Sequence, residues 1–103
     1  MNLADFGRFS DAALLILSSL AEGPKHGYGM MSDIETMVGV RLGPGTLYGA
    51  LARLESYGLI QAMPAEERRR PYKITAKGVA ALREQLKLLQ RLASIGLGRL
   101  AAQ

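Results

Sequence analysis

Residues 43–60, GPGTLYGALARLESYGLI, constrain the fold more than any other segment of the chain. At about 100° per residue, the segment predicts a helix with two different faces. One face is apolar, as in a helix packed on a core, and comprises Leu47, Ala50, Leu51, Leu54 and Gly58. The other is nearly bare and comprises Gly45, Gly49, Ala52 and Ser56, with Tyr48 and Arg53 beside it. Exposed helix faces normally carry long charged side chains. A bare face therefore predicts that the helix backbone approaches a large partner closely.

Basic residues follow this helix along the chain and indicate the charge of that partner. The chain has a net charge of +4, yet residues 1–40 hold two basic side chains against five acidic ones. Residues 41–77 hold seven basic against three acidic, and residues 78–103 hold four against one. Arg68, Arg69 and Arg70 are consecutive. This asymmetry favours a polyanion, and together with the bare helix face it points to DNA.

Composition argues against several other classes of protein. The absence of cysteine excludes a disulfide scaffold and thiolate metal sites, and it fits a reducing cytoplasm. With His26 as the single histidine and with scattered carboxylates, no pattern supports catalysis, so we expect no enzyme, metal or cofactor. The longest apolar run, residues 12–17, is far shorter than the roughly 20 residues of a membrane span. Residues 1–10 lack a secretory signal pattern, and we expect a cytoplasmic protein with no membrane partner.

Two helices are expected before the two-faced one. Ser10 is a candidate N-cap for a helix over residues 11–22, which is apolar around nearly its whole circumference. So small a chain hardly supplies enough protein to bury such a helix on all sides. A second helix is expected over residues 27–38, ended by Gly39. Its predicted inward residues are Tyr28, Met31, Ile34 and Val38.

A hairpin is expected after the two-faced helix. Residues 59–63 and 71–75 are short strand candidates, and the charged residues 64–70 form the turn between them. Proline removes a ladder hydrogen bond, so Pro71 predicts an edge strand in a hairpin that projects from the domain. Three helices followed by a projecting basic hairpin predict a winged helix-turn-helix, a mainly α fold with a small β-hairpin. We place this DNA-binding domain at residues 1–75.

The last helix, expected over 76–100 with Thr75 as its cap, predicts a dimer. Its apolar residues recur at the three- and four-residue steps of a coiled-coil seam, and residues 76–103 are assigned to dimerisation. A single small domain does not cover a long helix of this kind together with the apolar helix 11–22. The expected dimer contacts are Leu14, Leu17, Val79, Leu82, Leu86, Leu89, Ala93 and Leu100.

Three motifs resemble the PadR family of bacterial transcriptional regulators. They are G-P-x-H-G-Y at 23–28, P-G-T-L-Y-x-A-L-x-R-L-E-x-x-G-L-I at 44–60 and Y-x-x-T-x-x-G at 72–78. The likeness covers about residues 12–90, and the single C-terminal helix is similar to the family's smaller branch. It implies a homodimeric winged-helix repressor that a small molecule releases from its operator. Gly43, where the family often has serine, and Pro71 in the wing depart from the family pattern.

The expected DNA contacts come from three segments, each with a structural alternative. The residues are Lys25, His26, Tyr28, Pro44, Gly45, Thr46, Tyr48, Gly49, Arg53, Arg68, Arg69, Arg70 and Lys73. His26 and Tyr28 could instead be hydrogen-bonded boundary residues, and Tyr48 could pack on a neighbour. A winged-helix module that docks a protein helix on the bare face is the alternative function. The resemblance further implies a small effector, and the apolar surface at the dimer interface is where we expect it.

Overall fold

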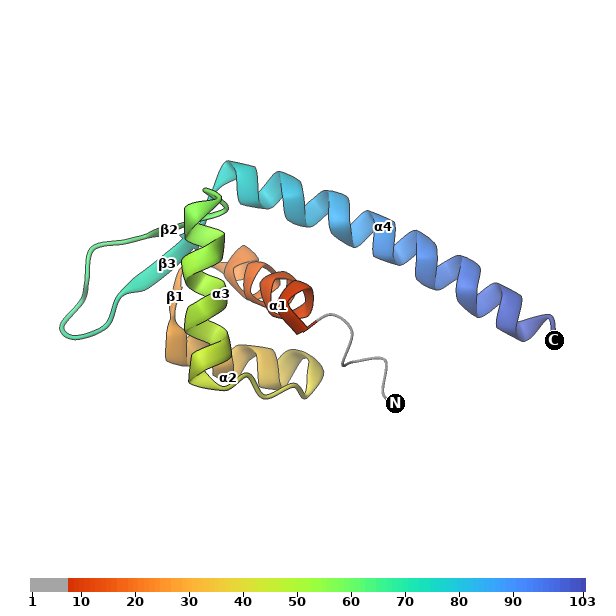
Figure 1. Ribbon diagram of the computed structural model, residues 1–103, viewed down its shortest axis with the longest axis horizontal. Helices are drawn as coiled ribbons and strands as arrows, with labels where there is room; N and C mark the ends of the chain where they lie inside the picture. The colour runs from red at the N-terminus through yellow and green to blue at the C-terminus, as the bar shows by residue number, and fades with distance from the viewer. Residues whose placement is uncertain (1–7) are drawn as a thin grey trace.

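A computed structural model describes residues 8–103 of the chain, which form four helices and a small three-stranded sheet. The first seven residues of the predicted domain 1–75 lie outside the described part. Figure 1 shows three helices gathered into one body, the hairpin projecting from one side and the last helix running away on the other. The elements are α1 (Arg8–Glu22), β1 (Lys25–His26), α2 (Gly27–Val38), α3 (Pro44–Ser56), β2 (Ile60–Ala62), β3 (Pro71–Ile74) and α4 (Ala76–Ala101). The predicted fold class, mainly helical with a small β-hairpin, is confirmed.

Helix α1 is the centre of the core. It contacts α2, α3, α4 and β3, and one chain alone covers more of it than its all-round apolar pattern indicated. Leu17, a predicted dimer contact, is buried in this core and offers no surface to a second copy, whereas Leu14 is half-buried. The helix also begins at Arg8, so Ser10 lies inside it and is not its N-cap. The buried apolar core comprises Ala12, Ile16, Leu17, Leu20, Met30, Ile34, Leu47, Ala50, Leu51, Leu54, Ile60 and Leu82.

The inward face of α2 agrees with the prediction at Ile34 and differs from it at Tyr28 and Val38. Gly27, Met30 and Ile34 are its buried residues, while Tyr28 is 76% exposed and Val38 is 55% exposed. Positions 27, 30 and 34 form one helical stripe, and positions 28, 31 and 38 form a second stripe about 100° away. Periodicity alone does not distinguish the two stripes, because both are largely apolar. The first one packs on α1, which leaves Tyr28 at the surface.

The sheet contains a strand that the sequence patterns do not reveal. β1 pairs with β3 and β3 pairs with β2, both antiparallel, so the strand order is β1-β3-β2. β3 is therefore the central strand, and the prediction that Pro71 marks an edge strand is wrong. Pro71 is tolerated because it is the first residue of β3. The two residues of β1 are too few to produce a periodic pattern.

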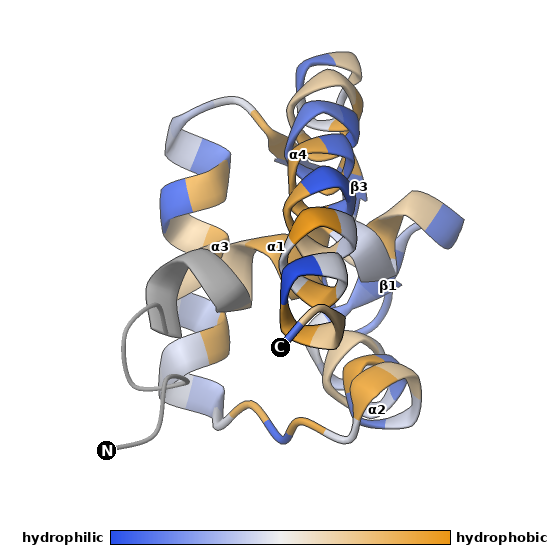
Figure 2. Ribbon diagram, turned by 90° about the vertical axis from the view of Figure 1, so that its right-hand side faces the viewer, coloured by the Kyte–Doolittle hydropathy of each residue, from blue (hydrophilic) through white to orange (hydrophobic). Residues whose placement is uncertain are grey.

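Helix α4 keeps only its first turns against the body. Leu82 is 6% exposed and belongs to the core of one chain. It therefore offers no surface to a second copy, and we no longer count it among the predicted dimer contacts. Figure 2 shows apolar and hydrophilic residues alternating along α4 toward its C-terminus. Beyond Leu82 its exposed large apolar residues are Leu86, Leu88, Leu92, Ile95, Leu97 and Leu100. Within residues 8–103, no helix is both long and apolar enough to cross a membrane.

The start of α4 is fixed to the end of α3 by a close backbone contact. Thr75 Oγ1 accepts a hydrogen bond from the Gly78 N–H at 3.0 Å, as predicted for the cap, and donates one to the Gly58 carbonyl at 2.7 Å. Gly58, with φ 75°, ends α3 in the left-handed conformation that favours glycine. A Cβ at Gly78 would lie 2.1 Å from the Leu59 carbonyl oxygen. Only glycine fits at position 78.

We expect Gly78→Ala to destabilise the protein by about 1–3 kcal/mol or more, because the new methyl group meets backbone, which does not rotate away. Urea unfolding followed by circular dichroism measures the change. Gly98→Ala is the matched control: the same substitution, in the same helix, meets no described atom within 4 Å. It is expected to be neutral or to stabilise by up to about 1 kcal/mol. Equal effects of the two substitutions would contradict this account of the contact.

Candidate nucleic-acid interface

The two predicted faces of α3 are both present. Leu47, Ala50, Leu51 and Leu54 are buried against the core. The small-residue face (Gly45, Gly49, Ala52 and Ser56) is exposed, and a Cβ added at Gly45 or Gly49 would meet no described atom within 4 Å. Gly43 caps the helix without a side-chain hydrogen bond, and Pro44 occupies its first turn. The side of α3 that turns away from the core is therefore open to a partner along its length.

Tyr48 stands beside the small-residue face and rests against the start of α2. Its side chain is 54% exposed. A Cβ at Gly27 would lie 2.7 Å from the Tyr48 hydroxyl oxygen and 3.1 Å from Cζ, so the glycine makes room for the ring. Gly27 was not among the predicted site residues, because its packing role depends on Tyr48, a residue of another helix that is distant in the sequence. The motif G-P-x-H-G-Y was the available signal.

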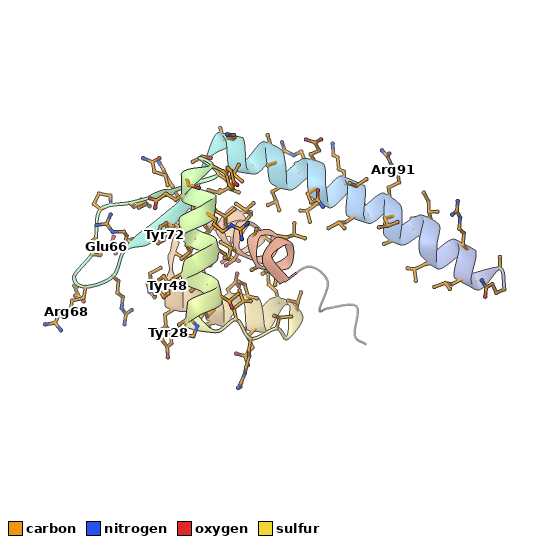
Figure 3. The ribbon with its side chains drawn as sticks, viewed as in Figure 1. Tyr28, Tyr48, Glu66, Arg68, Tyr72 and Arg91 are labelled. Carbon is orange, nitrogen blue, oxygen red and sulfur yellow. The ribbon has the colours of Figure 1, made fainter. Side chains whose placement is uncertain are left out.

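His26 and Tyr28 lie at the same end of α2. His26 is the N-cap of the helix, and its Nδ1 accepts a hydrogen bond from the Gly29 N–H at 3.3 Å. His26 is therefore hydrogen-bonded at the boundary of α2 through Nδ1, and its contact with DNA stays a prediction. Tyr28 is exposed, and Figure 3 shows it on the same side of the molecule as Tyr48 and the hairpin.

The hairpin ends in a tight turn that carries the three arginines. The backbones of Glu66 and Arg69 exchange two hydrogen bonds, of 2.7 Å and 2.9 Å, around a two-residue turn. Glu67, the first of those two residues, has φ 57°, a conformation that favours glycine or asparagine. The tip is exposed throughout, and Figure 3 shows Arg68 at its outer end. We call residues 60–74 the wing.

A hollow of about 330 Å³ joins these elements, and we call it the wing hollow. It lies where the start of α2, the exposed side of α3 and the wing converge (Figure 3). None of the described residues that line it is acidic, so it is an electropositive hollow with aromatic walls. Tyr72 of β3, which sequence reasoning did not select, lines it as well. The lining residues are His26, Gly27, Tyr28, Tyr48, Arg68, Arg69, Arg70 and Tyr72.

Lys25 does not join this surface. Its side chain is 17% exposed, and its Nζ donates to the Ser19 carbonyl oxygen and lies 3.7 Å from an Asp33 carboxylate oxygen. The buried Ser19 hydroxyl donates to the same carboxylate at 2.7 Å. A charged group removed from water is retained where it is paired and hydrogen-bonded. Lys25 therefore links α1 to α2 inside the molecule, and its expected role as a DNA contact is withdrawn.

The other selected residues are exposed but lie apart from the wing hollow. Thr46 and Arg53 are exposed on α3, and Pro44 is exposed at its start. Lys73 is exposed on β3, where it pairs with Gln61 of β2. The structure thus brings six of the thirteen predicted residues together at the wing hollow, and Figure 1 shows α4 running away from the hairpin.

A second hollow of about 650 Å³ lies between the end of α1 and the first half of α4. Leu82, Leu86 and Leu89 form an apolar wall, and Arg83 and Lys87 stand at its rim. It is continuous with the exposed apolar residues of α4. This is the region in which the sequence placed a dimer interface and an effector.

Comparison with known proteins identifies the family to which the chain belongs. The sequence model described as "Transcriptional regulator PadR-like family" matches residues 16–84, and so covers most of the elements that build the wing hollow. The chain is 39% identical over 88 residues to the transcriptional regulator Rv3488 of Mycobacterium tuberculosis, which covers 82% of this chain and 81% of that protein.

Two further relatives agree. The chain is 45% identical over 85 residues to an uncharacterized 37.1 kDa protein in transposon TN4556 of Streptomyces fradiae, a match to 82% of this chain but only 25% of that longer protein. The structure superposes on a transcriptional regulator from Clostridium thermocellum, Cth-833, with a TM-score of 0.78 and 30% identity, covering 92% and 94% of the two chains. The chain belongs to the PadR-like family of transcriptional regulators.

Proposed function

We propose that the protein is a sequence-specific DNA-binding repressor of the cytoplasm. The observation that carries this proposal is the wing hollow, in which three arginines and two exposed tyrosines gather beside the bare face of α3 with no acidic side chain among the described lining residues. A helix with so little side-chain bulk fits the major groove closely. The family supports regulation of transcription as the setting of this binding.

In this proposal the wing and the start of α3 contribute differently to DNA binding. The wing arginines contact phosphates or the minor groove and supply affinity for any sequence. Tyr48 and Thr46, near the start of α3, contact base edges and supply discrimination. Gly45 and Gly49 let the backbone of α3 approach the groove, while Pro44, Arg53, Lys73 and Tyr28 extend the contact along the DNA backbone.

The repressor acts as a homodimer in this proposal, with α4 as the main contact. One chain leaves Leu86, Leu97 and Leu100 exposed along one side of α4, and Val79, Leu89 and Leu14 are half-buried. Burial of these side chains against a second copy removes them from water. Two-fold symmetry then presents two copies of α3 to a roughly palindromic operator, about 34 Å apart.

A small apolar effector that releases the repressor would bind in the second hollow, against Leu82, Leu86 and Leu89. The hollow has the volume typical of small-molecule sites. The hollow also lies where the proposed dimer contact begins. A ligand bound there would therefore change the angle between the two chains of the dimer. Ala93 and Leu100 continue the contact beyond it.

Replacement of Arg68, Arg69 and Arg70 by alanine is expected to weaken binding to every duplex by roughly 10–100-fold and to flatten the salt dependence by about two to three units. Tyr48→Ala is expected to cost mainly discrimination, roughly 5–100-fold between promoter and scrambled DNA. Fluorescence anisotropy with the protein's own upstream promoter and a scrambled duplex, at two salt concentrations, measures both effects.

Arg91→Ala is the control for these variants, because Arg91 projects from α4 far from the wing hollow (Figure 3). It removes one positive charge and is expected to leave both affinities nearly unchanged. Equal losses on both duplexes for the tyrosine and arginine variants would contradict the division of labour. Failure of the unaltered protein to bind any duplex would favour the protein-docking module instead.

Leu86→Glu is expected to convert the dimer to monomer, because it places a charge in the apolar contact between copies. Sedimentation equilibrium measures the change in mass. Ser94→Glu introduces the same charge on the polar side of α4, together with Arg83, Lys87 and Arg91, and is expected to remain dimeric. A monomeric unaltered protein, or equal effects of the two variants, would remove α4 as the dimer contact.

Glu67→Asn is expected to tighten binding to any duplex roughly two- to fivefold, because it removes a negative charge beside the wing arginines. Asparagine also tolerates the left-handed conformation at this position, with φ 57°. Glu67→Gln removes the charge without that tolerance and separates the two effects. Anisotropy on the scrambled duplex measures the affinity, and weaker binding of the asparagine variant would contradict the prediction.

A further inference from the structure

His26 makes two contacts that a neutral imidazole ring does not satisfy together. Nδ1 lies 3.3 Å from the amide nitrogen of Gly29, and Nε2 lies 3.3 Å from Nη1 of Arg69. Both neighbours are hydrogen-bond donors, since a guanidinium carries only N–H groups. A neutral imidazole offers one accepting nitrogen and one N–H. One of the two neighbours therefore faces an N–H of the ring.

The helix cap decides which nitrogen accepts. The Gly29 N–H belongs to the first turn of α2 and has no partner within the helix, so His26 Nδ1 is its acceptor. The backbone fixes this amide in place, whereas Arg69 is an exposed side chain at the end of the wing, free to hydrogen-bond with water. The proton of the ring consequently lies on Nε2. Arg69 Nη1 and His26 Nε2–H then face each other as two donors.

Two donor nitrogens that lie 3.3 Å apart are close enough to bind one oxygen acceptor together. Arg69 is permanently charged, and the described residues that line the wing hollow offer no carboxylate to it. Tyr28 and Tyr48 line the same hollow, and a tyrosine hydroxyl is a further donor. The matching ligand is an anionic oxygen that approaches from outside the protein, within reach of both α2 and the wing.

We propose that His26 Nε2–H and the Arg69 guanidinium together hold one phosphate oxygen of the DNA backbone and thereby fasten the wing to the start of α2. This proposal rests on the proposed DNA-binding function. In the free protein the two donors face each other without an acceptor between them, and the β1–β3 pairing holds the wing beside the start of α2. On DNA the shared oxygen joins them and fixes the wing relative to α3.

A double-mutant cycle tests the pair. His26→Asn keeps a side-chain acceptor for the Gly29 N–H, because asparagine is a good N-cap, but it removes the Nε2–H donor. Arg69→Gln removes the charge. We expect each variant to lose roughly tenfold in affinity for a duplex, and the double variant to lose little more than either one, since one shared contact is lost. Additive losses, about 100-fold in the double variant, would overturn the proposal.

Arg68→Gln is the matched control, because Arg68 lines the same hollow but, in the part of the chain that the structure describes, it is Arg69 and not Arg68 that contacts His26. Its loss is expected to add to that of His26→Asn. His26→Asp keeps the cap and places a carboxylate against Arg69. It is expected to raise the melting temperature and to weaken DNA binding more than His26→Asn does, a divergence that a purely structural role of His26 would not produce.

The protonation state is measurable directly, because His26 is the only histidine in the chain. Long-range ¹⁵N–¹H NMR of the free protein is expected to show the proton on Nε2, and the Nε2 resonance is expected to move when a duplex is added. A proton on Nδ1 would overturn the proposal. The same shift with inorganic phosphate alone, combined with additive losses on DNA, would assign the pair to a free anion instead.

The experiment separates the two levels of inference. If the unaltered protein binds no duplex, the proposed function and the His26–Arg69 contact fail together. If it binds DNA and the losses are additive, only the contact between the wing and α2 fails. Coupled losses with the Nε2–H form support both.

Discussion

The burial of α1 is the constraint on which the rest of the structure depends. Three other helices and the central strand all contact it, so a single apolar cylinder determines where each of them lies. Because α1 is apolar on nearly all sides, it accepts neighbours from several directions at once. The buried apolar residues among the described part of the chain form one core, and both α3 and the wing are held by it. The arrangement of the DNA-facing surface is thus a consequence of packing around α1, although α1 itself contributes none of the residues that line the wing hollow.

Packing around α1 brings together three short segments that are far apart in the sequence. His26 ends β1, Tyr48 is in the second turn of α3, and the arginines follow β2 by several residues. The pairing of β1 with β3 draws the wing back toward the start of α2, and Gly27 lets the ring of Tyr48 lie against that helix. Each contact is small. Together they place donors and aromatic rings around one hollow, which no single segment could form alone.

The sequence predicts the parts of this molecule that repeat and misses those that depend on a distant neighbour. The two faces of α3 and the cap at Thr75 follow from local periodicity and side-chain chemistry, and both are confirmed. The two-residue strand β1 has no period, so the central position of Pro71 was not predictable. Lys25 resembled a surface cation until its partners on α1 and α2 were known. The inward stripe of α2 was ambiguous because two neighbouring stripes are apolar, and only the position of α1 selects between them.

The glycine contact at the start of α4 makes that helix a lever. A 26-residue helix is about 39 Å long, and it is joined to the body at one end, where Gly78 rests on the Leu59 carbonyl group. A rotation of about 10° at this fulcrum displaces the far end of α4 by about 7 Å. Leu59 immediately precedes β2, so the residue on which α4 rests is also the residue at which the wing begins. A rotation of α4 about this contact would consequently displace the start of the wing first.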